Sequence, residues 1–419
     1  MPLTAADLEY LRTPQAQKLL ADELPDEPVQ AVSKLRKRCS PEETSAILTM
    51  RELRRRARHS DRFPHALSER LLATDKMLQQ ASSWRLAVHK ARRLIAAGDG
   101  PIADLCCGMG IDALAIATEG RNVTAVDRDP AAILCTEHNA EVLNVASRLV
   151  VEQADVTRAC LPAEAIVHID PDRRPRGRRG TSLADAAPPP RFLAGVMTST
   201  AAGLIKLSAA IDPDELRSLP PCSREYVSEH GVVKQLLVGW GLPDRPAGRT
   251  FATRLTGDLL DPTATSLAAG IATPAGAGEC GAFLVEPDPA VIAADATDDL
   301  ATAHDLWRIE PGHVWLTGNA PPDTPLAASF EILDQAPGRE KDIARCLRKH
   351  RAGIVEVKPR GIRLDTDRLQ RTLRGDGPET LSVLWTRRGR SQIAFIARRC
   401  GPRPRRTHRP GEPPPSGGG

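Results

Sequence analysis

The sequence predicts an α/β fold: a doubly wound parallel sheet, preceded by a helical N-terminal domain and followed by a small α+β domain. Three observations predict this architecture. Helical patterns fill residues 1–97, short apolar strands alternate with helices over 102–170, and a β–α–β–α–β–β pattern covers 330–397. Strands that alternate with helices favour parallel β–α–β units. The predicted domains are therefore 1–97, 98–284 and 285–400, followed by 401–419, a tail with the composition of a disordered basic segment.

The helical N-terminal domain contains a capping box. Residues 40–43 read Ser-Pro-Glu-Glu, in which the serine and the second glutamate cap the first turn and the proline takes the first helical position. This pattern predicts a helix that runs to about His59. Two further helices are predicted, one from about Ser68 and one over Ser82–Ala97.

The two sheet-forming domains are predicted from short apolar runs that end at turns. Strands of the central domain are expected at 102–106, 122–126, 148–152, 165–169 and 203–206, with a helix over 131–143 and a hairpin over 226–240 that turns near 229–231. The C-terminal domain is expected to have strands at 330–333, 354–358, 380–385 and 392–397, with helices over 340–350 and 365–373.

Composition excludes several classes of protein. Of the 419 residues, 41% are apolar and 26% are charged, which is typical of a globular protein. No run approaches the ~18 apolar residues of a membrane span, and the N-terminus lacks the features of a secretory signal. We therefore expect no membrane partner and a cytoplasmic location. The nine cysteines form no Cys-x-x-Cys pair and the histidines show no metal-ligand spacing, so neither a disulfide framework nor a metal is expected.

Positive charge gathers toward the two ends of the chain. Residues 341–409 carry 20 Lys and Arg against 6 Asp and Glu. Residues 34–58 carry nine basic and three acidic side chains, with Arg51 and Arg54 among those at helical spacing. Basic regions on both sides of an acidic middle favour a polyanionic partner that is held at the ends while chemistry takes place in the centre.

The segment most informative about chemistry is 103–113, which reads Ala-Asp-Leu-Cys-Cys-Gly-Met-Gly-Ile-Asp-Ala. The glycine turn at Gly108 and Gly110 lets a ligand approach the backbone. The helix after the turn presents free N–H groups and the positive end of its dipole. Because the spacing to Ala113 also fits the dinucleotide fingerprint, NAD has to be considered beside other nucleotide cofactors.

Asp104 distinguishes between these cofactors. It is predicted at the carboxyl end of the first strand, four residues before Gly108. A carboxylate there would repel a pyrophosphate but attract the ammonium and sulfonium groups of S-adenosylmethionine (SAM), by up to ~4 kcal/mol for one contact before desolvation. The sequence therefore favours SAM over NAD. SAM is favoured in this way only if the carboxylate of Asp104 faces the glycine turn and not a partner inside the fold.

Further acidic residues follow the next predicted strands. Asp127 ends the second strand, 17 residues after Gly110, where a carboxylate can accept hydrogen bonds from ribose hydroxyls. Asp155 follows the third strand and can accept from an adenine amino group. Asp170 and Pro171 follow the fourth strand. In a doubly wound sheet these strand ends share the rim at which ligands bind.

The order of these motifs resembles that of class I SAM-dependent methyltransferases. It is most similar to bacterial methyltransferases with a THUMP-like C-terminal domain, which are distantly like trimethylguanosine synthases. The resemblance covers residues 40–400 and includes Gln79-Gln80-Ala81-Ser82-Ser83, Lys206-Leu207-Ser208 and Val357-Lys358-Pro359-Arg360-Gly361-Ile362. It implies a Rossmann-like methyltransferase sheet, SAM as the cofactor, methyl transfer as the activity and RNA as the substrate.

The resemblance also implies roles for single residues. The residues expected to bind the cofactor are Asp104, Gly108 and Gly110 at the methionine part, Asp127 at the ribose, Asp155 at the adenine, and Gln80, Ser82 and Ser83 closing over it. Asp170, with Pro171 beside it, is the expected catalytic residue, because a carboxylate there can accept a hydrogen bond from an acceptor N–H and orient the nitrogen lone pair toward the methyl group.

Basic residues on both sides of this site are the expected RNA contacts. They are Arg173, Arg174 and Lys206 near the strand ends, and Lys358, Arg360, Arg387 and Arg388 in the C-terminal domain. Relatives that methylate amino groups often place an aromatic after Asp-Pro-Pro, whereas this chain has Asp172-Arg173-Arg174 there. With only 3% aromatic residues, recognition of the phosphate backbone is favoured over base stacking.

Two other functions remain open from the sequence. One is a methyltransferase for a protein or a small molecule. The other is a non-catalytic RNA-binding protein that retains the fold. An NAD-dependent oxidoreductase is disfavoured by Asp104.

Overall fold

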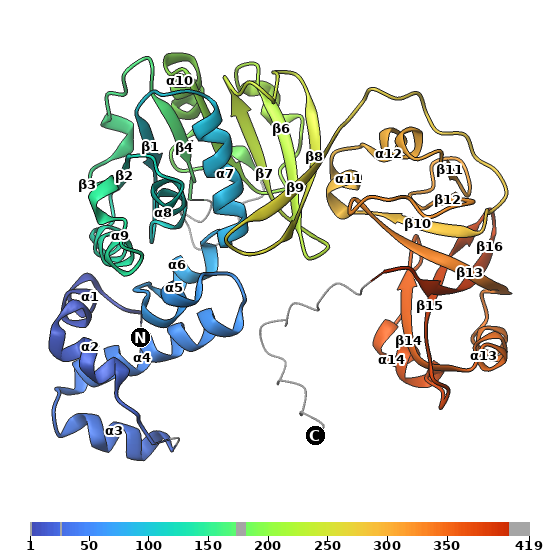
Figure 1. The fold of residues 1–419 in the computed structure, drawn as a ribbon, viewed down its shortest axis with the longest axis horizontal. Helices are drawn as coiled ribbons and strands as arrows, with labels where there is room; N and C mark the ends of the chain where they lie inside the picture. The colour runs from blue at the N-terminus through green and yellow to red at the C-terminus, as the bar shows by residue number, and fades with distance from the viewer. Residues whose placement is uncertain (1, 26, 173–181, 402–419) are drawn as a thin grey trace.

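The computed structural model describes residues 2–25, 27–172 and 182–401. Helices of the N-terminal region lie beneath one end of a nine-stranded sheet, and a second sheet of seven strands lies beside the far edge of the first (Figure 1). The predicted tail beyond residue 401 lies outside the described residues. The described part of the chain contains no helix that is both long and apolar enough to cross a bilayer.

Among the described residues, the helices before the first strand are α1 (Ala5–Arg12), α2 (Pro14–Ala21), α3 (Pro28–Arg36), α4 (Pro41–His59), α5 (His65–Arg70), α6 (Asp75–Gln80) and α7 (Trp84–Ala96). The capping box at the start of α4 is confirmed, because the side chains of Ser40 and Glu43 each accept a hydrogen bond from the other's backbone N–H. The helix expected from Ser68 is two short helices instead. Between them Leu72 is buried and exchanges two hydrogen bonds with the side chain of Asn139.

Two arginines of the basic N-terminal stretch are used inside the fold. Arg54 is buried and donates from Nε to the carbonyl of Leu71 at 3.0 Å, while Arg51 donates to the carbonyl of Leu20 at 2.8 Å. The expectation that this stretch holds a polyanion is therefore wrong for Arg51 and Arg54. Both arginines hold the N-terminal helices together, since buried carbonyls need donors.

The first sheet has the strand order β3-β2-β1-β4-β5-β7-β6-β8-β9. Its strands are β1 (Ile102–Leu105), β2 (Val123–Asp127), β3 (Leu149–Gln153), β4 (Ile166–Ile169), β5 (Ala202–Leu207), β6 (Ser223–Glu229), β7 (Val232–Trp240), β8 (Thr250–Gly257) and β9 (Pro262–Ala268). Strands β1–β5 are parallel, and the predicted β6–β7 hairpin is confirmed. The strands β8 and β9 were not expected.

After β5 the sheet departs from a dinucleotide-binding sheet. Strand β7 pairs antiparallel with β5 and lies between β5 and β6. In dinucleotide-binding folds the order is 3-2-1-4-5-6. The inserted antiparallel strand therefore separates this sheet from the NAD-binding fold that the glycine spacing allowed.

Apolar residues cover both faces of the first sheet. Along β1 the side chains alternate, so that Ile102 joins the core under α7 (Trp84–Ala96), α8 (Ile111–Thr118) and α9 (Pro130–Val142), while Ala103 joins the core on the opposite face with α10 (Pro190–Ser199). This sandwich fixes the ends of the parallel strands at one rim.

The second sheet has the order β11-β12-β10-β13-β16-β15-β14. Its strands are β10 (Phe283–Pro287), β11 (Trp307–Arg308), β12 (Leu316–Gly318), β13 (Ala327–Pro337), β14 (Ala352–Pro359), β15 (Glu379–Arg388) and β16 (Ser391–Arg399), and its helices are α11 (Pro289–Ala293), α12 (Thr297–Ala303), α13 (Glu340–Lys349) and α14 (Thr366–Leu373). The β–α–β–α–β–β pattern predicted here is confirmed from β13 to β16. Residue 285, the expected start of this domain, lies within β10, and one of the apolar cores of the first sheet continues through α11 and α12 as far as Leu326.

Candidate cofactor and acceptor site

The carboxyl ends of the parallel strands form one rim, and most of the predicted site residues lie along it. Asp127 is the last residue of β2, and the glycine turn follows β1. Ile169 of β4 pairs in register with Ile205 of β5, so the next residues, Asp170 and Lys206, lie side by side. This is the edge at which open α/β sheets bind ligands.

The glycine turn leaves its backbone open. Gly108 has a φ of +58°, and a Cβ added there would meet no atom within 4 Å. Gly110 has a φ of +83°, and a Cβ there would lie 2.7 Å from the side chain of Thr136. Both positions favour glycine because other residues rarely adopt this backbone region. Gly110 serves packing, whereas Gly108 provides an uncovered surface that fits a cofactor laid against the backbone.

Asp127 and Asp155 are accessible at this rim. The carboxylate of Asp127 is half-buried and accepts hydrogen bonds from the backbone N–H groups of Gly108 and Asp129, both at 3.0 Å. Asp155 is exposed, and its Oδ1 accepts from the backbone N–H and the hydroxyl of Thr157, which lowers the pKa of the carboxyl. A carboxylate oxygen can accept more than one hydrogen bond, so both residues retain capacity for a ligand.

Asp104 does not face the glycine turn. Its Oδ1 lies 2.7 Å from Nδ1 of His168, its Oδ2 accepts from the backbone N–H of Ala113 at 3.1 Å, and the residue is 1% exposed. The prediction that Asp104 contacts the cofactor is therefore wrong. The reason is that β1 and β4 place His168 opposite Asp104 in register, and a free N–H at the start of α8 attracts the carboxylate. Because this carboxylate is held inside the fold, its charge no longer disfavours NAD.

A buried polar cluster surrounds Asp104 and His168. Its other members are Lys90, Asp112 and Ser82: the ammonium of Lys90 lies 2.6 Å from Oδ1 of Asp112, 3.0 Å from Oγ of Ser82 and 3.3 Å from Nε2 of His168. Burial lowers the pKa of Lys90 and raises that of Asp104. Burial alone would raise the pKa of Asp112 too, but Lys90 and His168 outweigh it and hold this pKa well below its usual value. Through the hydrogen bond from Ala113 to Asp104, the cluster holds the start of α8, which directly follows the glycine turn.

The residues expected to close over the cofactor have other partners. Ser82 is buried and lies 3.2 Å from Oδ2 of Asp112. Ser83 is the N-cap of α7, and its hydroxyl donates to Glu229 at 2.7 Å. The prediction of direct cofactor contact is thus wrong for both serines, because buried hydroxyls are satisfied within the fold. Gln80 is half-buried at the end of α6, and its cofactor contact stays a prediction.

Lys206 is not available as an RNA contact. It is 6% exposed, and its ammonium lies 2.5 Å from Oδ2 of Asp170 and 3.2 Å from the carbonyl of Gln80. The prediction for Lys206 is therefore wrong: its charge holds the carboxylate of Asp170. Within the described residues, Oδ1 of Asp170 has no hydrogen-bond partner, and the side chain is partly exposed. One oxygen is fixed and the other can accept a hydrogen bond.

The other predicted RNA contacts differ in their surroundings. Arg173 and Arg174 lie outside the described residues. Lys358, predicted as an RNA contact, is paired with Glu286 at 2.7 Å, so a neighbouring carboxylate already compensates its charge. Arg360 is half-buried. Arg387 and Arg388 are exposed at the β15–β16 turn, and so is Arg390.

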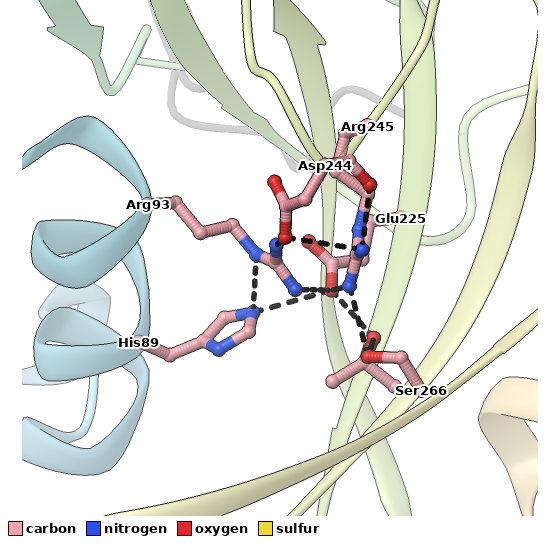
Figure 2. Close-up of polar contacts among 7 residues, drawn as sticks. His89, Arg93, Glu225, Asp244, Arg245 and Ser266 are labelled. Atoms are coloured by element: carbon pink, nitrogen blue, oxygen red, sulfur yellow. Dashed lines mark hydrogen bonds and ion pairs between the residues drawn. The ribbon is translucent and has the colours of Figure 1, made fainter. Parts of the chain in front are cut away.

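A second buried polar cluster was missed by sequence reasoning. Glu225 of β6 lies 3.0 Å from Nη2 of Arg93 on α7 and 3.3 Å from Nη2 of Arg245, and it accepts from the hydroxyl of Thr253 at 2.5 Å (Figure 2). Arg93 also pairs with Asp244. These contacts fasten α7 to the antiparallel part of the sheet. Glu225 lies 132 residues from Arg93 in the sequence, so no local pattern indicates this pair.

Three family models match parts of this chain. A model described as RNA cap guanine-N2 methyltransferase matches residues 100–177, and one described as THUMP domain-like matches 327–399. A domain of unknown function matches 4–57. The first match includes β1–β4 and the rim residues, and the second includes β13–β16.

Relatives extend over most of the chain. Proteins from two strains of Mycobacterium tuberculosis, described as uncharacterized S-adenosylmethionine-dependent methyltransferases, are 29% identical over 356 residues, covering 82% of this chain and 93% of theirs. A crystal structure from Porphyromonas gingivalis, described as a "putative methyltransferase", aligns with a TM-score of 0.69 at 19% identity, covering 96% of this chain and all of that one. At that identity the likeness concerns the fold.

The fold, the rim and these matches define the class of protein. It is a SAM-dependent methyltransferase with a class I sheet. Its C-terminal end carries a THUMP-like domain, as the sequence resemblance implied. The cofactor of this class fits the open backbone at Gly108 and the accessible carboxylate of Asp127.

Proposed function

We propose that this protein transfers the methyl group of SAM to RNA. The observation that carries the proposal is the match of an RNA cap guanine-N2 methyltransferase model to the segment that contains the glycine turn, Asp127 and Asp170. A THUMP-like domain on the same chain supports it, as do the exposed arginines at the β15–β16 turn. Guanidinium groups suit phosphates because they present several donors in a planar fork.

The proposed cofactor contacts follow the rim. Gly108 and Gly110 provide the backbone against which the methionine part lies, and Asp127 accepts hydrogen bonds from the ribose hydroxyls. Asp155 accepts from the adenine amino group. Gln80 covers the cofactor from the end of α6. Asp104 acts indirectly. It accepts a hydrogen bond from the N–H of Ala113, which fixes the start of α8 and with it the glycine turn.

When bound, SAM supplies an activated methyl group on a positively charged sulfur. The protein's part is to align the acceptor and to exclude water. Asp170 accepts a hydrogen bond from the acceptor N–H through Oδ1, which turns the nitrogen lone pair toward the methyl group. Lys206 holds Oδ2 at 2.5 Å and so restricts the rotation of this carboxylate. Pro171 is buried and fixes the backbone after Asp170.

RNA is proposed to reach this site along basic surface. Arg387, Arg388 and Arg390 bind phosphates at the β15–β16 turn. The hairpin is held in place because Glu310 accepts from the backbone N–H of Gly389 at 3.0 Å. Arg173 and Arg174, which follow Asp170 closely in the sequence, are proposed to steer phosphates toward the acceptor site.

The test uses an extract from cells that lack this protein, separated into RNA, protein and small-molecule fractions. Each fraction is incubated with the purified protein and methyl-labelled SAM. We expect label in RNA alone, at a nucleoside that mass spectrometry then identifies. Label in protein or in small molecules would instead support a methyltransferase for that class. Binding of S-adenosylhomocysteine and RNA without any label would support a non-catalytic RNA-binding protein.

A further inference from the structure

The short helix α6 is held mainly by polar contacts. Of its six residues, Leu78 alone is buried. On the side of the N-terminal helices, Arg62 donates to the carbonyls of Leu78 and Ala81, and Arg56 pairs with Asp75 at 2.5 Å. A helix of this length is not stable by itself in water. Its position therefore depends on the groups that hold its two sides.

The other side of α6 is attached to the segment that carries Asp170. Nζ of Lys76 lies 2.7 Å from Oδ2 of Asp172, and Nε2 of Gln80 lies 3.5 Å from Oδ1 of the same carboxylate. Lys206 adds a third link, since its one ammonium contacts both the carbonyl of Gln80 and the carboxylate of Asp170. Figure 1 shows α6 between the other N-terminal helices and the start of α7, at one end of the first sheet.

The strengths of these links differ. The ammonium of Lys206 is buried, where a charge pair is strong and its loss leaves an unpaired charge. The side chain of Lys76 is 59% exposed and that of Asp172 is 27% exposed. Exposed ion pairs contribute little net stability, so this link can open and close readily. The strong link ties α6 to the proposed catalytic residue, and the weak one fastens its outer side.

We propose that Lys76 and Asp172 are positioning residues that latch α6 beside the acceptor site at Asp170. The latch rests on the proposed function, because the acceptor is an RNA nucleotide. Closing the latch brings the carbonyl of Gln80 onto Lys206, and Lys206 then sets the direction of the Asp170 carboxylate. Asp172, two residues after Asp170, thus performs a positioning task for the acceptor site.

Charge reversal tests the latch. Lys76→Glu and Asp172→Lys are each expected to lower kcat/KM for RNA about three- to tenfold, because a pair that contributes up to about 1 kcal/mol is replaced by repulsion. The dissociation constant for S-adenosylhomocysteine should stay within about twofold. The double variant K76E/D172K should recover most of the loss, which a merely structural disturbance would not do. Arg92→Glu is the matched control, since Arg92 pairs with Glu119 at the opposite end of α8 from the glycine turn.

Hydrogen exchange provides a readout that does not need turnover. The amides of α6 should exchange faster in Lys76→Glu than in the wild type, while those of β4 do not change. Unchanged exchange in α6, unchanged kcat/KM in Lys76→Glu, or no recovery in a folded double variant would overturn the latch. Failure of the proposed function would appear differently, as a wild-type protein that transfers no methyl group to RNA.

Discussion

Asp104 and His168 form an in-register pair across β1 and β4, with 2.7 Å between Oδ1 and Nδ1, and neither residue is more than 1% exposed. Nε2 of the same imidazole lies 3.3 Å from the ammonium of Lys90. The imidazole thereby joins the carboxylate of Asp104 to the ammonium of Lys90 within the buried cluster. Asp104 supports the cofactor turn through the fold, and the cofactor does not have to touch it.

Replacing Asp104 should first affect stability. In Asp104→Asn the amide can satisfy His168, but the N–H of Ala113 loses its charged acceptor. We expect the free energy of unfolding to fall by about 1–3 kcal/mol, with weaker cofactor affinity as a consequence. Denaturant unfolding measures the loss. Unchanged stability together with abolished S-adenosylhomocysteine binding would instead support direct contact between Asp104 and the cofactor.

The pair of Gly108 and Gly120 separates backbone strain from cofactor contact. Both have positive φ, at +58° and +95°, and at neither would an added Cβ meet an atom within 4 Å. Either change to alanine should cost about 1–2 kcal/mol of strain. Only Gly108→Ala should weaken S-adenosylhomocysteine binding by about tenfold or more, since its methyl group occupies the cofactor's place. Calorimetry compares the affinities of the two variants for S-adenosylhomocysteine. Equal affinities would show that the cofactor does not lie against the glycine turn.

Asp170 should matter for turnover and not for cofactor binding. In Asp170→Asn the hydrogen-bond acceptor is weakened and Lys206 loses its charge partner. We expect kcat to fall about 100-fold or more, while calorimetry finds S-adenosylhomocysteine affinity little changed. Wild-type turnover in this variant would show that Asp170 does not act on the acceptor.

The arginines at the β15–β16 turn should determine the salt dependence of RNA binding. Replacing Arg387, Arg388 and Arg390 by glutamate removes up to three phosphate contacts. The slope of log affinity against log salt should then flatten by about 2–3 units. Lys358→Met is the control, since Lys358 already pairs with Glu286. If the slope stays at its wild-type value, RNA binds elsewhere.

Acid should lower the free energy of unfolding by protonating the carboxylate of Glu225. Burial alone would raise the pKa of this carboxyl, but His89, Arg93 and Arg245 outweigh burial and hold the pKa well below its ordinary value of 4.5. A lowered pKa contributes stability above pH 4.5, and this contribution is lost as the pH falls further. Glu225→Gln should therefore lower the free energy of unfolding by about 3–5 kcal/mol at pH 7. The difference in unfolding free energy between the variant and the wild type should shrink below pH 4.5. An equal difference at pH 7 and below pH 4.5 would show that it does not come from the lowered pKa of Glu225.

Local patterns were enough to predict most of the fold. The capping box at 40–43, the alternation of strands and helices from β1 to β5, and the pattern from β13 to β16 are all local in sequence. Strand β9 was missed because it is largely exposed and polar, so it lacks a continuous apolar run. The split of the helix expected from Ser68 depends on Asn139, a partner far along the chain.

The site was harder to predict because charges were assigned to ligands before their partners were known. Asp104, Lys206 and Lys358 each find an opposite charge or a histidine on another strand. Residues whose part depends on backbone shape, such as Gly108, or on a strand end, such as Asp127, lie where the sequence placed them. Pairing across a sheet is a long-range property that one sequence does not display.

The central claim is that RNA receives the methyl group. The most direct measurement compares total RNA from cells that lack this protein with RNA from cells that contain it, each incubated with the purified protein and methyl-labelled SAM. The account predicts label in the first RNA and little in the second, whose acceptor nucleotide is already methylated. Equal labelling of both, or none in either by a protein that binds S-adenosylhomocysteine, would contradict it.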